Sequence, residues 1–322
     1  MKQLLLLISL LASAFIHSQA KTDLETEGLK GKVKKLTRFS YSVSEDSSRY
    51  VATKQITEYN EKGFQIRNCD MVKPQEQNVI GSKREYKYDA FGNRVEIRWY
   101  SSDTVLSNRK VMVYDEKNQK NQEVEYGQNG RMKEKRVYLY DEKGHEIEIK
   151  HYAYDENNLA LKQISTYDDR GNLLSLSTYN DKNVLVYEYR YKYDTANNKI
   201  EKMYWKPAAV EKTEMKYNTQ NKMTELIWYK NDKQVYKQVL TYDANNNVIE
   251  DRYISEKKTT VTKRKYNAKN DLIEQLEFEN DILKRKEICQ FKYDNQGNWV
   301  EWKQWVDDGG PGNVGRIIEY YN

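Results

Sequence analysis

The sequence predicts an all-β protein in which tandem β-hairpin repeats of about 26 residues form a long antiparallel meander, a twisted or coiled sheet. Three observations support this fold class. A Tyr-Asp or Tyr-Asn phrase returns ten times at that interval, and apolar and polar residues alternate around it. The chain has 28 Tyr and 6 Trp but 3 Pro in 322 residues. A fixed interval indicates a repeat architecture, and alternation with period two indicates strands.

The first 20 residues are expected to lie outside this fold. They contain one basic residue, Lys2, an apolar run from Leu4 to Ile16, and small residues at Ser18 and Ala20. This order is typical of a secretory signal peptide. A membrane anchor is the alternative, but the run is shorter than the roughly 18 residues that suggest a span. We therefore expect a signal peptide over 1–20 and a single repeat domain over 21–322, with no transmembrane segment once the signal is removed.

Export predicts a periplasmic, cell-surface or secreted protein, and the charge limits its partners. The formal net charge is +5, and basic and acidic residues are interleaved along the chain. No basic block is present, so a nucleic-acid partner is not expected. The cysteines, Cys69 and Cys289, are too few for a disulfide framework. In a linear array they would lie near opposite ends, so we expect no bridge.

The repeated phrase has three restricted positions. It opens with Tyr, continues with Asp or Asn, and has Gly or Asn three residues after that. An Asp or Asn at the start of a type I turn can bond its side chain to the following backbone, and a left-handed residue at the end favours Gly or Asn. This is a bulged hairpin turn. The clearest structural turn residues are Asp89, Gly92, Asp141, Gly144, Asp168, Gly171, Asp294 and Gly297. The ten opening tyrosines are Tyr59, Tyr88, Tyr114, Tyr140, Tyr167, Tyr193, Tyr217, Tyr242, Tyr266 and Tyr293.

A second, looser turn lies half-way through each repeat, as in "YGQNGR" from 126 and "YNDKNV" from 179. Two strands of about eight residues per repeat give roughly 20 strands. The basic stretch 29–42 suits an unpaired edge strand, because charged edges discourage pairing with other chains. A final strand is expected over 316–321. The sequence leaves open whether the sheet is an open superhelix or closes toward a barrel.

The phrases "YDAFGNRVEIRWY" from 88, "YDEKGHEIEIKHY" from 140, "YDDRGNLLSLSTY" from 167 and "YDNQGNWVEWKQW" from 293 resemble the YD repeats of the RHS family. The resemblance covers about residues 50–300 and implies a long β-strip. Half of the copies depart from it with Asn in place of Gly, and the chain lacks the core region and toxin domain of the large members. A looser resemblance, on Tyr content and period, is to MORN-like hairpin arrays, including small immunity-type proteins.

Residues suited to catalysis or cofactor binding are scarce. His145 stands at a turn position and His151 at a strand position, where other repeats have Asn and Trp. Nucleophile-elbow, P-loop and dinucleotide motifs are absent from the sequence, and the turn Asp residues do not follow calcium-loop spacing. We therefore expect no enzyme activity, no metal and no cofactor.

Aromatic residues near the second turns form a candidate binding surface, because aromatic side chains are enriched in recognition patches. The alternative is that they cover the sheet. A glutamate recurs at one strand position, as at Glu96 and Glu274, and suggests ion pairs or, alternatively, ligand-binding carboxylates. The expected function is an exported, non-enzymatic scaffold that binds a protein or carbohydrate. The alternative is an immunity or structural component of a secreted toxin system. The surface comprises Trp99, Tyr100, Trp205, Trp228, Tyr229, Trp302 and Trp305.

Overall fold

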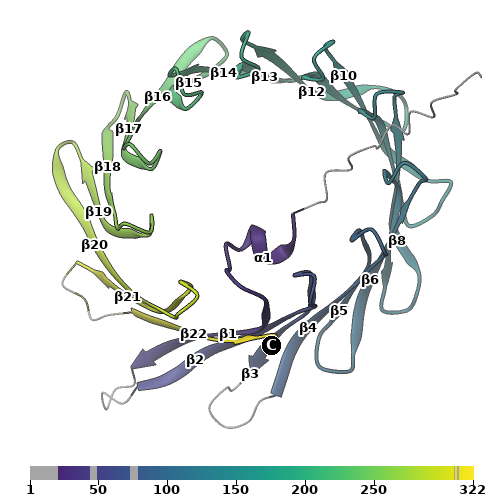
Figure 1. Cartoon of the computed structure of the whole chain (residues 1–322). Coiled ribbons are helices and arrows are strands. Elements are labelled where there is room, and N and C mark those ends of the chain that lie inside the picture. Colours follow the sequence, from purple (N-terminus) through teal and green to yellow (C-terminus); the bar gives the residue numbers. More distant parts are fainter. Residues whose placement is uncertain (1–20, 44–48, 73–78, 308, 310–311) are drawn as a thin grey trace, which may run out of the picture.

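The protein is a closed antiparallel β-barrel with a short helix inside its ring of strands (Figure 1). The computed structural model describes residues 21–43, 49–72, 79–307, 309 and 312–322, so the expected signal peptide lies outside the described residues. These residues form one helix and a sheet of 22 strands. None of the helices in this part of the chain is long and apolar enough to cross a membrane.

The elements are α1 (Asp23–Thr26), β1 (Val33–Val43), β2 (Arg49–Tyr59), β3 (Gln65–Val72), β4 (Val79–Tyr88), β5 (Arg94–Tyr100), β6 (Leu106–Tyr114), β7 (Lys120–Gly127), β8 (Met132–Tyr140), β9 (Glu146–Ala153), β10 (Leu159–Tyr167), β11 (Leu173–Asn180), β12 (Leu185–Tyr193), β13 (Lys199–Lys206), β14 (Ala209–Tyr217), β15 (Met223–Lys230), β16 (Lys233–Tyr242), β17 (Val248–Ser255), β18 (Thr259–Tyr266), β19 (Leu272–Glu279), β20 (Ile282–Tyr293), β21 (Trp299–Val306) and β22 (Gly312–Tyr320).

The all-β antiparallel meander is confirmed, but its ends are not free. Each strand pairs with its neighbours along the chain, and β1 pairs both with β2 and with β22. The predicted edge strand over 29–42 is therefore wrong, and the twisted or coiled sheet closes into a barrel. A sheet of this many twisted strands must curl, and closure satisfies the backbone groups that an edge would expose. The final strand also begins earlier than expected, at Gly312.

Closure changes the predicted placement of the two cysteines. Cys69 lies on β3 and Cys289 on β20, and both are buried and free. The seam brings these strands near each other, because β2, β1, β22 and β21 alone lie between them around the ring. The prediction of opposite ends was wrong because it assumed a linear array.

The turn that follows each repeated Tyr has the geometry that its restricted residues favour. In the turn after Tyr88, Asp89 Oδ1 accepts hydrogen bonds from the N–H groups of Phe91 and Asn93, both at 2.9 Å. Gly92 closes the turn with a φ of 89°. The strand register shifts beside Tyr88, as a bulged hairpin requires. The corresponding positive-φ residues are Gly63, Gly144, Gly171, Gly297, Asn118, Asn197, Asn221, Asn246 and Asn270.

The repeated Tyr joins neighbouring hairpins where their strands diverge. Pairing between β7 and β8 covers Gln122 to Tyr126, so Lys120 has no ladder partner on β8. Tyr140, at the end of β8, donates its hydroxyl to the Lys120 carbonyl at 2.8 Å. A side-chain hydrogen bond thus replaces the missing backbone ladder. The same bond joins Tyr88 to Gln65, Tyr114 to Arg94, Tyr167 to Glu146, Tyr193 to Leu173, Tyr217 to Lys199, Tyr242 to Met223 and Tyr266 to Val248.

The Gly or Asn of several turns contacts a residue of the preceding repeat. Asn172 donates its side-chain amide to Asn197 of the next turn at 3.1 Å, so the left-handed Asn forms part of a ladder along the rim. The same contact joins Asn93 to Asn118, Asn198 to Asn221 and Asn247 to Asn270. At two Gly turns the preceding repeat has a larger ring instead: a Cβ on Gly92 would lie 2.7 Å from Phe64 Cζ, and one on Gly171 would lie 2.9 Å from His145 Nε2.

The N-terminal segment completes the ring. Leu24 of α1, with Leu29, Val33, Leu36 and Tyr59, forms a buried cluster against the inner wall. Thr22 and Glu25 make a capping box that fixes the start of α1. After the helix, Lys30 exchanges two hydrogen bonds of 2.8 Å with the side chain of Asn298, through its N–H and its carbonyl. The N-terminal segment therefore contacts Asn298 in the way that the turn of a following repeat would. It continues the ladder of rim contacts across the junction of β1 and β22.

Removing the bridging hydroxyl in Tyr140→Phe should destabilise the barrel by about 1–3 kcal/mol, because the Lys120 carbonyl loses its partner in a partly buried place. The free energy of unfolding in urea measures this. Tyr154→Phe is the control, since that ring is 80% exposed. Equal stability of the two variants would contradict a bridging role.

Gly92→Ala should cost more stability than Gly130→Ala by about 1–3 kcal/mol, the cost of overpacking. Both glycines have a positive φ, of 89° and 73°, so the left-handed strain is shared. A Cβ on Gly92 would meet the buried Phe64 ring, whereas one on Gly130 meets no atom within 4 Å. The same urea titrations compare them, and an equal loss would mean that backbone strain alone selects Gly92.

Candidate ligand-binding site

The barrel wall has an inner face, against which α1 packs, and an outer face. Directly opposed residues in an antiparallel ladder share a face, so the register traced from Leu36 through the paired strands assigns each side chain. The inner wall is the surface that closure creates. The hairpins joining β16 to β17 and β18 to β19 curl toward the barrel axis at one rim (Figure 1).

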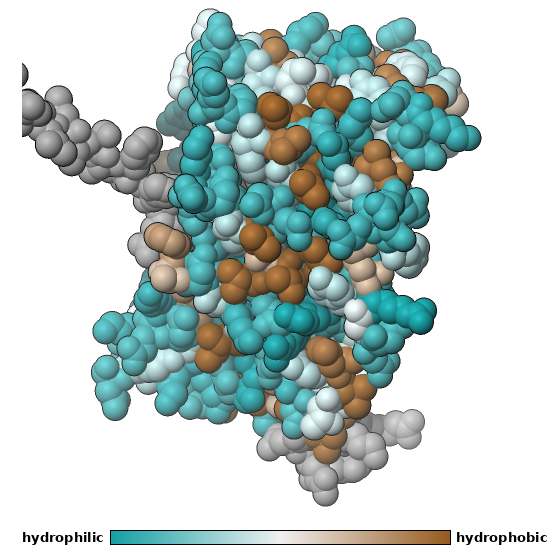
Figure 2. All heavy atoms as spheres, turned by 90° about the vertical axis from the view of Figure 1, so that its right-hand side faces the viewer, coloured by the Kyte–Doolittle hydropathy of each residue, from teal (hydrophilic) through white to brown (hydrophobic). Residues whose placement is uncertain are grey.

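The outer wall carries the recurring glutamates in ion pairs, as the first interpretation predicted. Glu96 contacts Lys87 at 2.8 Å and Arg98 at 2.9 Å, and also pairs with Arg109. Burial opposes ionisation of Glu96, but the hydrogen bonds from these cations outweigh it and lower its pKa to about 2. Figure 2 shows the outer wall around β8 as hydrophilic toward both rims, with apolar side chains gathered along its middle among polar ones. Cross-strand pairs of the same kind are Lys192–Glu201, Lys216–Glu225, Lys265–Glu274 and Lys292–Glu301.

The seven aromatic residues of the predicted surface are divided between the two faces. Trp99, Trp228 and Trp302 face inward, while Tyr100, Trp205, Tyr229 and Trp305 face outward. The outer members are held in the polar wall: the Tyr229 hydroxyl donates to Glu214 at 3.1 Å, and Lys212 Nζ lies 4.5 Å from the centre of the Tyr229 ring. Neighbouring residues of a strand point in opposite directions, so they do not form one surface.

Trp228 belongs to a larger set of rings on the inner wall, which we call the aromatic arc. It comprises Tyr187, Tyr189, Tyr191, Tyr204, Trp228, Tyr236 and Tyr253, on β12, β13, β15, β16 and β17. Ring centres lie 4.8 Å apart for Tyr189 and Tyr204, 5.5 Å for Trp228 and Tyr236, and 4.6 Å for Tyr236 and Tyr253. All of these side chains are partly buried. The arc therefore consists of two groups of packed rings, one on β12 and β13 and one on β15 to β17, with β14 between them.

Another part of the inner wall, on β6 to β9, carries a network of charged side chains around the buried ring of Tyr138. Glu123 contacts Lys120 at 2.8 Å, Arg136 at 3.0 Å and Lys110 at 3.6 Å. Burial opposes ionisation of Glu123, but its contacts with Lys120 and the neighbouring cations outweigh it and lower the pKa. His151 accepts a hydrogen bond from Arg136 Nε at 3.2 Å and belongs to this network.

His145 lies apart from the charged network, in a turn. It bonds Asp141 at 2.9 Å and stacks on Tyr167 with ring centres 4.6 Å apart. Neither histidine joins a cluster of metal ligands, since the described residues include no group of three or more His, Cys, Asp or Glu that could hold a metal ion.

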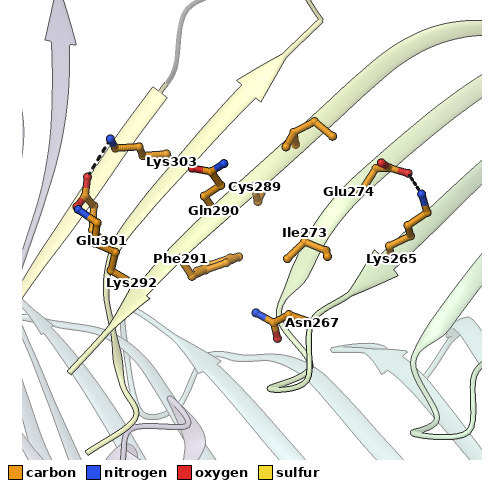
Figure 3. A pocket seen from close by; sticks show the side chains of 11 residues that line it. Lys265, Asn267, Ile273, Glu274, Cys289, Gln290, Phe291, Lys292, Glu301 and Lys303 are labelled. Atoms are coloured by element: carbon orange, nitrogen blue, oxygen red, sulfur yellow. Dashed lines mark ion pairs between the residues drawn. The ribbon is translucent and has the colours of Figure 1, made fainter. Parts of the chain in front are cut away.

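A cleft of about 640 Å³ opens where the ladder between β19 and β20 ends at Glu274 and Ile288 (Figure 3). Phe291 and Ile273 lie on opposite sides of the gap, and the neighbouring charges are paired, Glu274 with Lys265 at 2.7 Å. The bridging Tyr differs here: Tyr293 contacts the side chains of Asp271 and Asn267 in place of a carbonyl. The cleft marks an altered repeat interface.

Cys289 also lines this cleft, and burial raises the pKa of its thiol. A raised pKa keeps the thiol protonated and therefore a weak nucleophile. The cleft thus holds paired charges and a protonated thiol, whereas the aromatic arc is the candidate binding site.

The predicted binding surface included Trp228 but none of the other six rings of the aromatic arc. The available signal was the register: with each hairpin turn fixed, Tyr189 falls opposite Tyr204 and Trp228 opposite Tyr236.

Comparison with known proteins identifies no family: no family model matches, and no curated protein matches. Among solved structures, the chain is similar to the TcdB2-TccC3-Cdc42 complex (11% identity, TM-score 0.31, 88% of this chain and 20% of that chain). It is also similar to porin-like proteins from Bacteroides uniformis (9%, 0.32, 90% and 99%) and Bacteroides vulgatus (10%, 0.24, 90% and 98%). The chain spans a fifth of the first. These scores are too low to transfer a function.

Proposed function

We propose that this protein is an exported, non-enzymatic binding protein whose inner barrel wall holds an oligosaccharide. The aromatic arc carries the proposal, because its two groups of rings place seven aromatic side chains on the inner face of the barrel. Partly buried aromatic residues in a concave setting are typical of ligand-binding sites.

The chemistry of the arc favours a sugar over a polypeptide. A pyranose ring has C–H groups on its faces and hydroxyls around its edge, so it can stack on an aromatic face while it hydrogen-bonds at the rim. Tyr supplies both an apolar ring and a polar tip. A polar side chain lies within the same stretch of wall: Gln238, which donates to Asp251 at 2.8 Å, is opposite Leu226 and Tyr253.

The charged residues of the outer wall favour a barrel that is surrounded by water after export. A membrane-spanning barrel carries an outward apolar band about 25 Å tall. Here the outward face carries charges in the middle of its strands, at Arg98, Arg109 and Lys150, whose side chains are 36%, 46% and 37% exposed. Lipid around such charges would be costly, whereas water solvates them.

Trp228→Ala should weaken binding of a stacked oligosaccharide about tenfold, because one lost aromatic contact of about 1.4 kcal/mol corresponds to that factor. Trp205→Ala is the matched control, since its ring faces outward. Titration calorimetry against neutral and acidic oligosaccharides of six to ten or so sugar units measures the affinities, with circular dichroism as the folding check. An equal effect of both substitutions, or no binding by the intact chain, would contradict the proposal.

A further inference from the structure

Three lysines on β13 and at its start lie on tyrosine rings of the aromatic arc. Lys199 Nζ lies 4.3 Å from the centre of the Tyr191 ring, and Lys202 Nζ lies 4.7 Å from that of Tyr189. Lys206 Nζ lies 5.6 Å from the Tyr204 ring. All three side chains are partly buried. The aromatic arc therefore includes positively charged side chains among its rings.

These lysines differ from those of the outer wall on the same strands. On the outer face Lys192 of β12 forms an ion pair with Glu201 of β13 at 2.9 Å. The three inner lysines form no ion pair with a carboxylate anywhere in the described chain, and ring faces alone hold them. A cation over an aromatic ring gains about 0.5–1 kcal/mol at an exposed site, which leaves its charge uncompensated.

The surrounding inner wall offsets only part of this charge. The described residues include all of β12 to β14, and there Glu211 is the one acidic side chain on the inner face, since Glu188, Glu201 and Glu214 face outward. Burial, and then the nearby charge of Lys202, lower the pKa of Lys199. An anion bound here would relieve that repulsion.

We infer that the aromatic arc selects an acidic oligosaccharide, whose carboxylate or sulfate groups contact Lys199, Lys202 and Lys206 while its sugar rings contact the adjoining aromatic side chains. The inference rests on the proposed function and names its ligand class. Charge-assisted hydrogen bonds from lysine to such groups are stronger than neutral ones. The three lysines are spaced along one strand, which suits an oligosaccharide in which charged sugars recur.

Two matched ligand pairs test the inference on the mature chain. Oligogalacturonate is compared with its methyl ester, and a κ-carrageenan oligosaccharide with its desulfated form, so each pair contrasts an acidic with a neutral chain of the same sugars. Titration calorimetry at low and high salt measures all four. We expect at least one acidic member to bind about tenfold more tightly than its neutral partner at low salt, with the difference shrinking as salt screens it. A difference within the first pair indicates recognition of carboxylates, and a difference within the second indicates recognition of sulfates.

Lys202→Gln should weaken binding of the acidic member more than that of its neutral partner and so remove most of that preference, whereas Lys192→Gln, on the outer wall, should change neither affinity. Inorganic polyphosphate is the third probe: binding as tight as that of the acidic sugar, unaffected by Trp228→Ala, would overturn the inference in favour of unselective anion binding. Equal affinity for both members of each pair would overturn it while the proposed function stands. Failure of every oligosaccharide to bind would overturn both.

Discussion

The pairing of β1 with β22 is the contact on which the rest of the molecule depends. Leu36 lies opposite Ile318 across this seam, and Lys35 pairs with Glu319 at 2.8 Å on the outer face. At the rim, the Lys30–Asn298 exchange continues the turn ladder into the N-terminal segment. Without this seam there would be two exposed sheet edges and no inner wall. The buried cluster around α1 would also lose Ile318, which packs against it from β22.

The repeat reaches closure through interfaces that are alike, except the altered one at Tyr293. Each turn fixes its own hairpin, and the Tyr hydroxyl fixes that hairpin to the preceding one, as between Tyr140 and Lys120. Stability in such arrays is approximately a sum of repeat and neighbour terms. The wall can therefore vary its strand residues while the rim stays constant. This division explains how one face holds ion pairs, as at Lys265–Glu274, and the other a run of rings, as at Tyr236–Tyr253.

Much of this could be predicted from the sequence, because turn chemistry is local. Asp89 and Gly92 occupy the places in a bulged turn that their types favour, and the alternation around Glu96 indicates strands. Closure could not be predicted, since it depends on the curvature summed over all strands and on a contact between Lys30 and Asn298 that no local pattern announces. Without closure, the sequence also does not show which side of each strand faces inward. Trp228 and Tyr229 are adjacent in sequence, yet Trp228 lies on the inner face of the wall and Tyr229 on the outer face. The function of the rings depends on which wall is inside.

Closure is therefore the claim to test first, and small-angle X-ray scattering of the mature chain tests it most directly. A closed barrel predicts a compact particle with the deep scattering minimum of a hollow cylinder, and the same profile at every protein concentration. An open strip of hairpins would instead give an elongated particle with a long tail in its distance distribution. That profile would contradict the pairing of β1 with β22 and remove the inner wall on which the proposed binding site depends.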